Sequence, residues 1–146
     1  MTPESIFSIA NFFALASWLL LVVFPNRKVT RLAVRSGAVP ILLSSAYLAL
    51  IVLFFTSAEG GFGALPDVQL LFTNRWVALA GWLHYLAFDL LVGTWEVQEA
   101  SVKKIPHLLV IPCLVATFLF GPVGFLLFFV LQFVVGKEVK DDPETV

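Results

Sequence analysis

Apolar residues along the chain fall into four long blocks separated by polar segments. A helix that crosses a hydrocarbon core of about 30 Å needs about 20 predominantly apolar residues. The pattern predicts three such spans at about residues 6–24, 39–56 and 75–95. They are joined by a polar loop at 25–38 and a glycine-containing loop at 57–74. The chain is therefore predicted to be an all-α integral membrane protein.

The fourth apolar block, residues 105–135, is too long for one straight span. At 1.5 Å per residue it would extend roughly 46 Å, against a hydrocarbon core of roughly 30 Å. Two interpretations are open: two short legs that turn at Gly121–Gly124, or an interfacial segment at 105–111 followed by one span at 112–135. We favour the second, with a kink at Gly121-Pro122, because half of the block barely crosses a membrane. The predicted fold is a membrane four-helix bundle.

Charge along the chain predicts how the helices are oriented. The loop at 25–38 is positively charged and carries no acidic residue. Its basic residues are Arg27, Lys28, Arg31 and Arg35. The positive-inside rule places this loop in the cytoplasm, or in the stroma of a plastid, for an inner, plasma or thylakoid membrane. With four spans, the N-terminus and the C-terminal tail at 137–146 are both expected on the opposite side.

Composition narrows the possible functions. Only 13% of the 146 residues are charged, against about 25% in a soluble domain, and this length fits one domain, residues 1–146. A net charge of −1 gives no reason to expect nucleic-acid binding. A single cysteine, Cys113, allows no intrachain disulfide or thiolate metal site. Two histidines, His84 and His107, are too few for a histidine-rich di-iron centre. No metal or cofactor site is predicted.

The third predicted span carries most of the polar residues. On a helical wheel of about 100° per residue, one stripe about 80° wide holds six of them, with His84 at its edge. The stripe contains Asn74, Gly81, Tyr85, Asp89, Glu96 and Glu99. Asp89 lies about six residues, or roughly 9 Å, inside the predicted cytoplasmic end. A carboxylate at that depth is costly and usually faces a bundle interior, where it often marks function.

Two roles for Asp89 are open. It is either a functional acid or a structural clamp tied to Tyr85, one turn away, and to a polar group on another helix. His84 lies about 140° around the helix axis from Asp89, so a direct bond within the helix is not expected, although both could flank one cavity.

Further residues are candidates for lining a ligand site. Pro122 removes one helix hydrogen bond and frees the Phe118 carbonyl, and broken helices with free carbonyls commonly line sites. A packing kink is the alternative. Asn11 on the first span is expected to hydrogen-bond between helices or to line the site. The predicted ligand-binding residues are Asn11, Gly81, Trp82, Gly121 and Pro122.

The segment Gly81–Leu90, with Ile105–His107, Pro112-Cys113 and Gly121–Gly124, resembles the abscisic-acid-deficient-four-like family. A pattern close to Trp-x-His-x-x-x-x-Asp-Leu in plant members falls on Trp82 to Leu90 of this chain. The resemblance covers nearly the whole chain and implies four spans in the same order. The family includes a plastid protein, often called neoxanthin synthase, that is needed to make neoxanthin from violaxanthin. This chain starts at its first span without a transit peptide, so we expect a bacterial or cyanobacterial member.

The resemblance implies a membrane protein of carotenoid metabolism and a specific chemistry. Violaxanthin to neoxanthin is an isomerisation without redox change: an acid protonates the epoxide oxygen, the ring opens, and a base removes a proton to leave an allene. In this hypothesis Asp89, helped by Tyr85, is the acid and His84 is the base. The bound molecule is a carotenoid or another polyene lipid.

Two other classes of function remain beside the isomerase. The first is a non-catalytic subunit that binds a pigment or lipid, or supports the assembly of a membrane-protein partner or a second copy of the chain. The second is a small proton or solute carrier. One buried acid in a bundle without internal repeats supports a carrier less well than it supports the other two functions. The lipid bilayer is the partner expected in every case.

Overall fold

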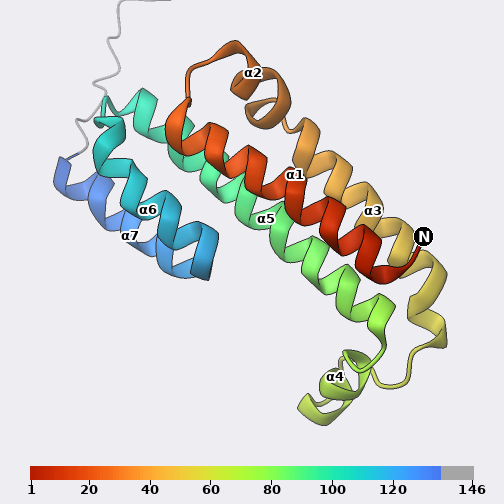
Figure 1. Ribbon diagram of the computed structural model, residues 1–146. Helices are drawn as coiled ribbons and strands as arrows, with labels where there is room; N and C mark the ends of the chain where they lie inside the picture. The colour runs from red at the N-terminus through yellow and green to blue at the C-terminus, as the bar shows by residue number, and fades with distance from the viewer. Residues whose placement is uncertain (136–146) are drawn as a thin grey trace, which may run out of the picture.

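The computed structural model describes residues 1–135, which contain helices and no strand. Figure 1 shows that α5 (Arg75–Val102) runs the length of the molecule. α1 (Pro3–Val23) and α3 (Ala38–Phe54) pack along it. The predicted all-α class is confirmed.

Three helical segments are long and apolar enough to cross a membrane: Pro3–Val23, Lys28–Ser57 and Arg75–Val102. They contain the three predicted spans at 6–24, 39–56 and 75–95 except for residue 24 at the end of the first. α5, however, continues for about two turns past the predicted end at residue 95. Large apolar side chains are exposed along the helices, as expected for contact with lipid tails.

Local sequence explains where the two longest helices begin. Thr2 precedes α1, and its hydroxyl accepts a hydrogen bond from the Ser5 N–H at 3.3 Å, with Pro3 in the first turn. Asn74 precedes α5, and its side-chain oxygen accepts a 2.9 Å bond from the Trp76 N–H. Asn74, which the wheel placed in the polar stripe, is therefore an N-cap.

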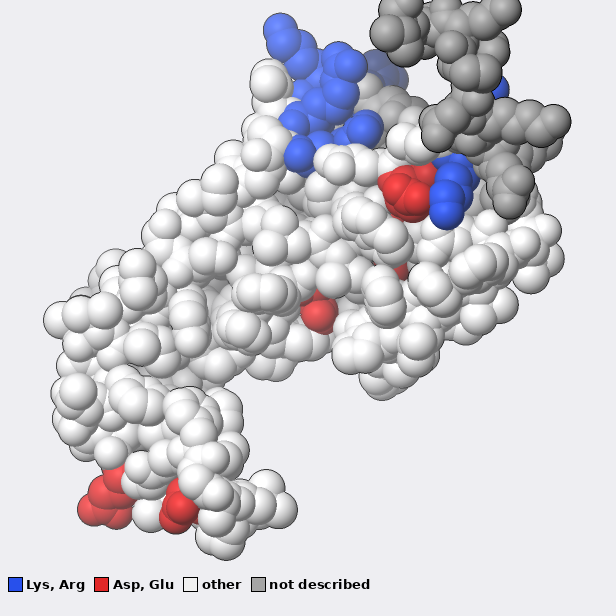
Figure 2. Space-filling view, turned by 180° about the vertical axis from the view of Figure 1, so that it is seen from behind, with Lys and Arg blue, Asp and Glu red and all other residues white. Residues whose placement is uncertain are grey.

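Short elements connect the long helices. After α1 come α2 (Lys28–Thr30) and a π-helical turn, η1 (Arg31–Arg35). After α3 come a 3-10 turn, η2 (Phe55–Ser57), and α4 (Leu65–Leu71). In Figure 2, lysine and arginine gather at one end of the molecule, which we call the basic end. The positive loop predicted at 25–38 follows the last turn of α1 and leads into α3, and it lies at this end.

The last apolar block forms two helices, α6 (His107–Phe120) and α7 (Pro122–Val135), which lie side by side as a hairpin (Figure 1). The prediction of an interfacial segment at 105–111 followed by one kinked span at 112–135 is therefore wrong. Gly121 adopts a φ of +44°, which reverses the chain where a kinked helix would have continued. With 14 residues each, the two helices are roughly 21 Å long. The predicted count of four spanning helices is not confirmed.

The hairpin also changes the expected position of the chain end. α7 returns to the basic end, where the Lys103 ammonium donates a 2.7 Å hydrogen bond to the Gln132 side chain. The last described residue, Val135, thus lies at the opposite end of the molecule from the N-terminus (Figure 1). The sequence had placed both termini at the same end. The predicted outer tail at 137–146 lies outside the described residues.

Candidate active site

Asp89 lies near the midpoint of α5, deeper than the sequence predicted, because the helix continues past Trp95. The tip of the α6–α7 hairpin, Phe120–Pro122, meets α5 at this point. A Cβ atom added to Gly121 would lie 2.8 Å from Asp89 Oδ1 and 3.2 Å from Oδ2. Only glycine lets the tip approach the carboxyl group this closely, and its positive φ also favours glycine.

The carboxyl group of Asp89 is only partly satisfied. Its Oδ2 atom is buried and has no hydrogen-bond partner among residues 1–135. A buried polar atom without a partner is costly, and such exceptions often mark functional sites. Figure 2 shows acidic atoms in the middle of an otherwise uncharged surface, away from the charged groups at the two ends of the molecule. Asp89 is therefore a carboxyl group half-way along α5 with one oxygen that no described residue bonds.

Tyr85 links Asp89 to the hairpin. Its hydroxyl donates a 2.9 Å hydrogen bond to the Phe118 carbonyl, which lacks its helical partner because residue 122 is proline. The same hydroxyl adjoins the Asp89 carboxyl. The Tyr85 hydroxyl thus donates to the backbone and also lies close enough to Asp89 for the two side chains to interact. Its oxygen can accept a hydrogen bond from a protonated Asp89 carboxyl group.

An aromatic cleft lies between α1 and α5, nearer the first turns of both helices than Asp89 is. Its volume is about 420 Å³ and its walls are mostly apolar. It is lined by Pro3, Glu4, Phe7, Ser8, Arg75, Ala78, Leu79 and Trp82. The rings of Phe7 and Trp82 lie 5.5 Å apart, and those of Trp82 and Tyr85 5.2 Å apart. This aromatic row runs from the cleft to Tyr85, which adjoins Asp89. Trp82 also donates a 3.0 Å hydrogen bond to Asn11.

His84 and Gly81 lie on a different side of α5. The His84 ring contacts Tyr47 of α3 at 5.6 Å between ring centres and stacks on Phe88 at 4.5 Å. Both His84 and Gly81 line a separate pocket of about 260 Å³ with Phe72 and residues of α3. The structure therefore brings Asp89, Tyr85 and the hairpin tip together, with Asn11 and Trp82 beside them. It does not bring His84 to Asp89.

Glu96 is the residue that the sequence interpretation undervalued. It is fully buried beneath the hairpin, and its Oε1 accepts a 2.8 Å hydrogen bond from Thr117. Its Oε2, like Asp89 Oδ2, has no partner in the described part of the chain. The signal was present, because Glu96 shares the helical stripe of Asp89. It was missed because the span was expected to end at Trp95, which placed Glu96 outside the membrane.

Thr117→Val is expected to lower the free energy of unfolding by about 1–2 kcal/mol, because it leaves both Glu96 oxygens unpaired in an apolar interior. Thermal unfolding in detergent measures the change. Thr56→Val is the matched control, since Thr56 is exposed. Equal unfolding temperatures for the two variants would show that the Thr117–Glu96 bond does not hold the hairpin.

The site offers no cluster of metal ligands. Within residues 1–135, no three His, Cys, Asp or Glu side chains come together as a metal site requires. What the site offers is a carboxyl group, a phenol and an apolar aromatic cleft. These can move a proton to and from a water-insoluble ligand.

Comparison with known proteins identifies one family. Residues 5–128 match the model of the ABA DEFICIENT 4-like family. The matched range includes every residue of the Asp89 site and most of the hairpin. No curated protein and no solved structure matches the chain.

Proposed function

The chain belongs to the ABA DEFICIENT 4-like family, and from this premise we propose that it isomerises an epoxy-carotenoid within the membrane, without redox change. One observation carries the proposal: Asp89 has a buried oxygen without a partner among the described residues, beside Tyr85, the last ring of an aromatic row that begins in the cleft. A ligand confined to the bilayer can reach this position, because the hairpin covers only the half of α5 nearer the basic end (Figure 1).

Asp89 alone can carry both proton transfers. The protonated carboxyl group gives its proton to the epoxide oxygen, one C–O bond breaks, and the oxygen becomes a hydroxyl. The carboxylate then removes a proton from the carbon next to the positively charged one. The electrons of that C–H bond form the new double bond and leave an allene. Asp89 regains its proton, so atoms, charge and electrons balance.

Tyr85 and the hairpin tip would position this acid. The Tyr85 hydroxyl is held by the Phe118 carbonyl at 2.9 Å, so its oxygen is fixed beside Asp89. Gly121 closes the site on the side of the basic end. A carboxyl group that is held in a fixed position and shielded from water can transfer a proton without first losing bound water molecules.

His84→Gln is expected to retain most of the wild-type activity, because His84 faces α3 and not Asp89. The assay incubates the protein in liposomes with an epoxy-carotenoid and separates products of unchanged mass by chromatography. A loss of about 10²-fold or more, the usual effect of removing a general base, would instead make His84 the base. It would then refute the single-carboxyl mechanism.

A non-catalytic pigment-binding subunit is the second candidate. The observation that favours it is the cleft itself, which is open and mostly apolar, and whose two charged residues, Glu4 and Arg75, are paired with each other. A binding subunit would return the epoxy-carotenoid unchanged in the same assay, whereas the proposed isomerase releases a product.

A further inference from the structure

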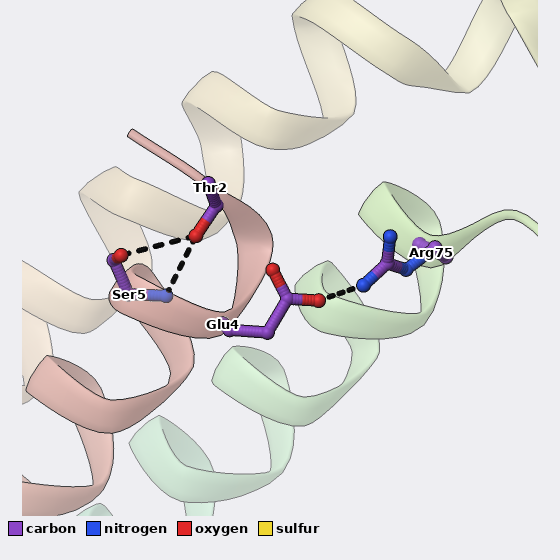
Figure 3. A network of polar contacts seen from close by, with 4 residues as sticks. All are labelled: Thr2, Glu4, Ser5 and Arg75. Carbon is purple, nitrogen blue, oxygen red and sulfur yellow. Dashed lines mark hydrogen bonds and ion pairs between the residues drawn. The ribbon is translucent and has the colours of Figure 1, made fainter.

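The outer rim of the aromatic cleft carries a pair of opposite charges. Glu4 at the start of α1 and Arg75 at the start of α5 form an ion pair across the gap between the two helices, as Figure 3 shows. Both side chains line the cleft, and they are 60% and 71% exposed. They are the charged groups in an otherwise uncharged and mostly apolar lining.

The rim lies at a defined distance from Asp89. Arg75 and Asp89 are on the same straight helix, so the rise of 1.5 Å per residue separates them by roughly 21 Å along the axis. Phe7, Trp82 and Tyr85 lie between them as the aromatic row. The rim and Asp89 are thus two polar positions along α5 with an aromatic surface between them.

We propose that Glu4 and Arg75 bind the hydroxyl group at the far end of an elongated polyene whose other end lies at Asp89. This inference rests on the proposed function, since it concerns the same ligand. A hydroxyl group can donate to the Glu4 carboxylate and accept from the Arg75 guanidinium at once. The rim therefore selects hydroxylated polyenes over hydrocarbon polyenes of equal length.

The charges at the rim favour a hydroxyl group over a lipid phosphate. Glu4 neutralises Arg75, so the pair offers no net positive charge to an anion. Lysine and arginine side chains gather at the basic end instead (Figure 2). A neutral group that both donates and accepts matches the rim better than a phosphate does.

The test compares two ligands on three proteins in neutral detergent, using quenching of tryptophan fluorescence as the measure of binding. The ligands are an epoxy-carotenoid with a hydroxyl group on its distal ring and the same skeleton without that group. Wild type is expected to bind the hydroxylated ligand about tenfold more tightly, the worth of one charge-assisted hydrogen bond. Arg75→Met is expected to remove the preference without weakening binding of the unsubstituted ligand. Arg31→Met, at an exposed arginine of the basic end, is the matched control and should keep it.

The outcomes separate this inference from the proposed function. A wild type that binds both ligands equally, or an Arg75→Met variant that keeps the preference, would overturn the inference and leave the proposed function standing. Displacement of the carotenoid by phosphatidylglycerol vesicles from wild type but not from Arg75→Met would assign the rim to a phosphate and also overturn it. A wild type that binds neither ligand would overturn both. Because the pair is exposed, Arg75→Met should fold normally, and circular dichroism checks this.

Discussion

Asp89→Asn is expected to lower the rate of isomerisation by about 10²–10⁴-fold, the usual effect of removing a general acid or base. The amide has nearly the shape of the carboxyl group, so it should fit beneath Gly121. It cannot give up a proton to an epoxide and take another back. Bound pigment should therefore be retained while product formation is lost. Product is measured by chromatography and bound pigment by absorption of the same purified sample.

Asp67→Asn is the matched control for this prediction. Asp67 lies in α4, away from the hairpin, and the same change there should leave the rate within about twofold of wild type. An Asp89→Asn variant that still forms product at the wild-type rate would show that Asp89 is the structural clamp and not the acid.

Gly124→Ala is expected to have the largest effect on stability. A Cβ atom at residue 124 would lie 2.0 Å from Thr117 Oγ1, 2.1 Å from its nitrogen and 2.4 Å from its Cα. Two of these are backbone atoms, so α6 and α7 must move apart to admit one methyl group. Overpacking of this kind costs about 1–3 kcal/mol, and the shift also carries Gly121 away from Asp89. We therefore expect both the unfolding temperature and the rate of isomerisation to fall.

Gly61→Ala separates the packing effect from the general effect of replacing glycine. A Cβ atom there would have no neighbour within 4 Å, so stability and activity should stay near wild type. Thermal unfolding by circular dichroism in one detergent compares the two variants. If Gly124→Ala unfolded at the same temperature as Gly61→Ala, the close contact between α6 and α7 would not exist in the membrane protein.

The helices α1, α3 and α5 could be predicted from the sequence because each contains one apolar block bounded by polar residues. The end of α5 could not, since Trp95 resembles an interfacial residue although its ring packs on Phe128 of the hairpin, at 5.3 Å between ring centres. The hairpin was one of two open interpretations, and it was set aside on length. The length argument assumed that each helix must cross the whole membrane, whereas α6 and α7 have 14 residues each.

The candidate site was predicted in part. Asp89 and Tyr85 were found because a helical wheel places them on one face and burial of a carboxylate is costly. The wheel cannot say which neighbouring helix covers each sector of α5. His84 and Asp89 were therefore grouped as one acid–base pair, although α3 covers one and the hairpin covers the other. Glu96 was passed over because its depth depended on the misplaced end of α5.

The most direct measurement is a count of product molecules per protein molecule. The purified protein, reconstituted in liposomes under nitrogen, is given a large excess of an epoxy-carotenoid, and the pigments are extracted and separated by mass and absorption. The account predicts an allenic product of unchanged mass in amounts well above one molecule per protein. Recovery of the epoxy-carotenoid unchanged would contradict it and would assign the cleft to pigment binding alone.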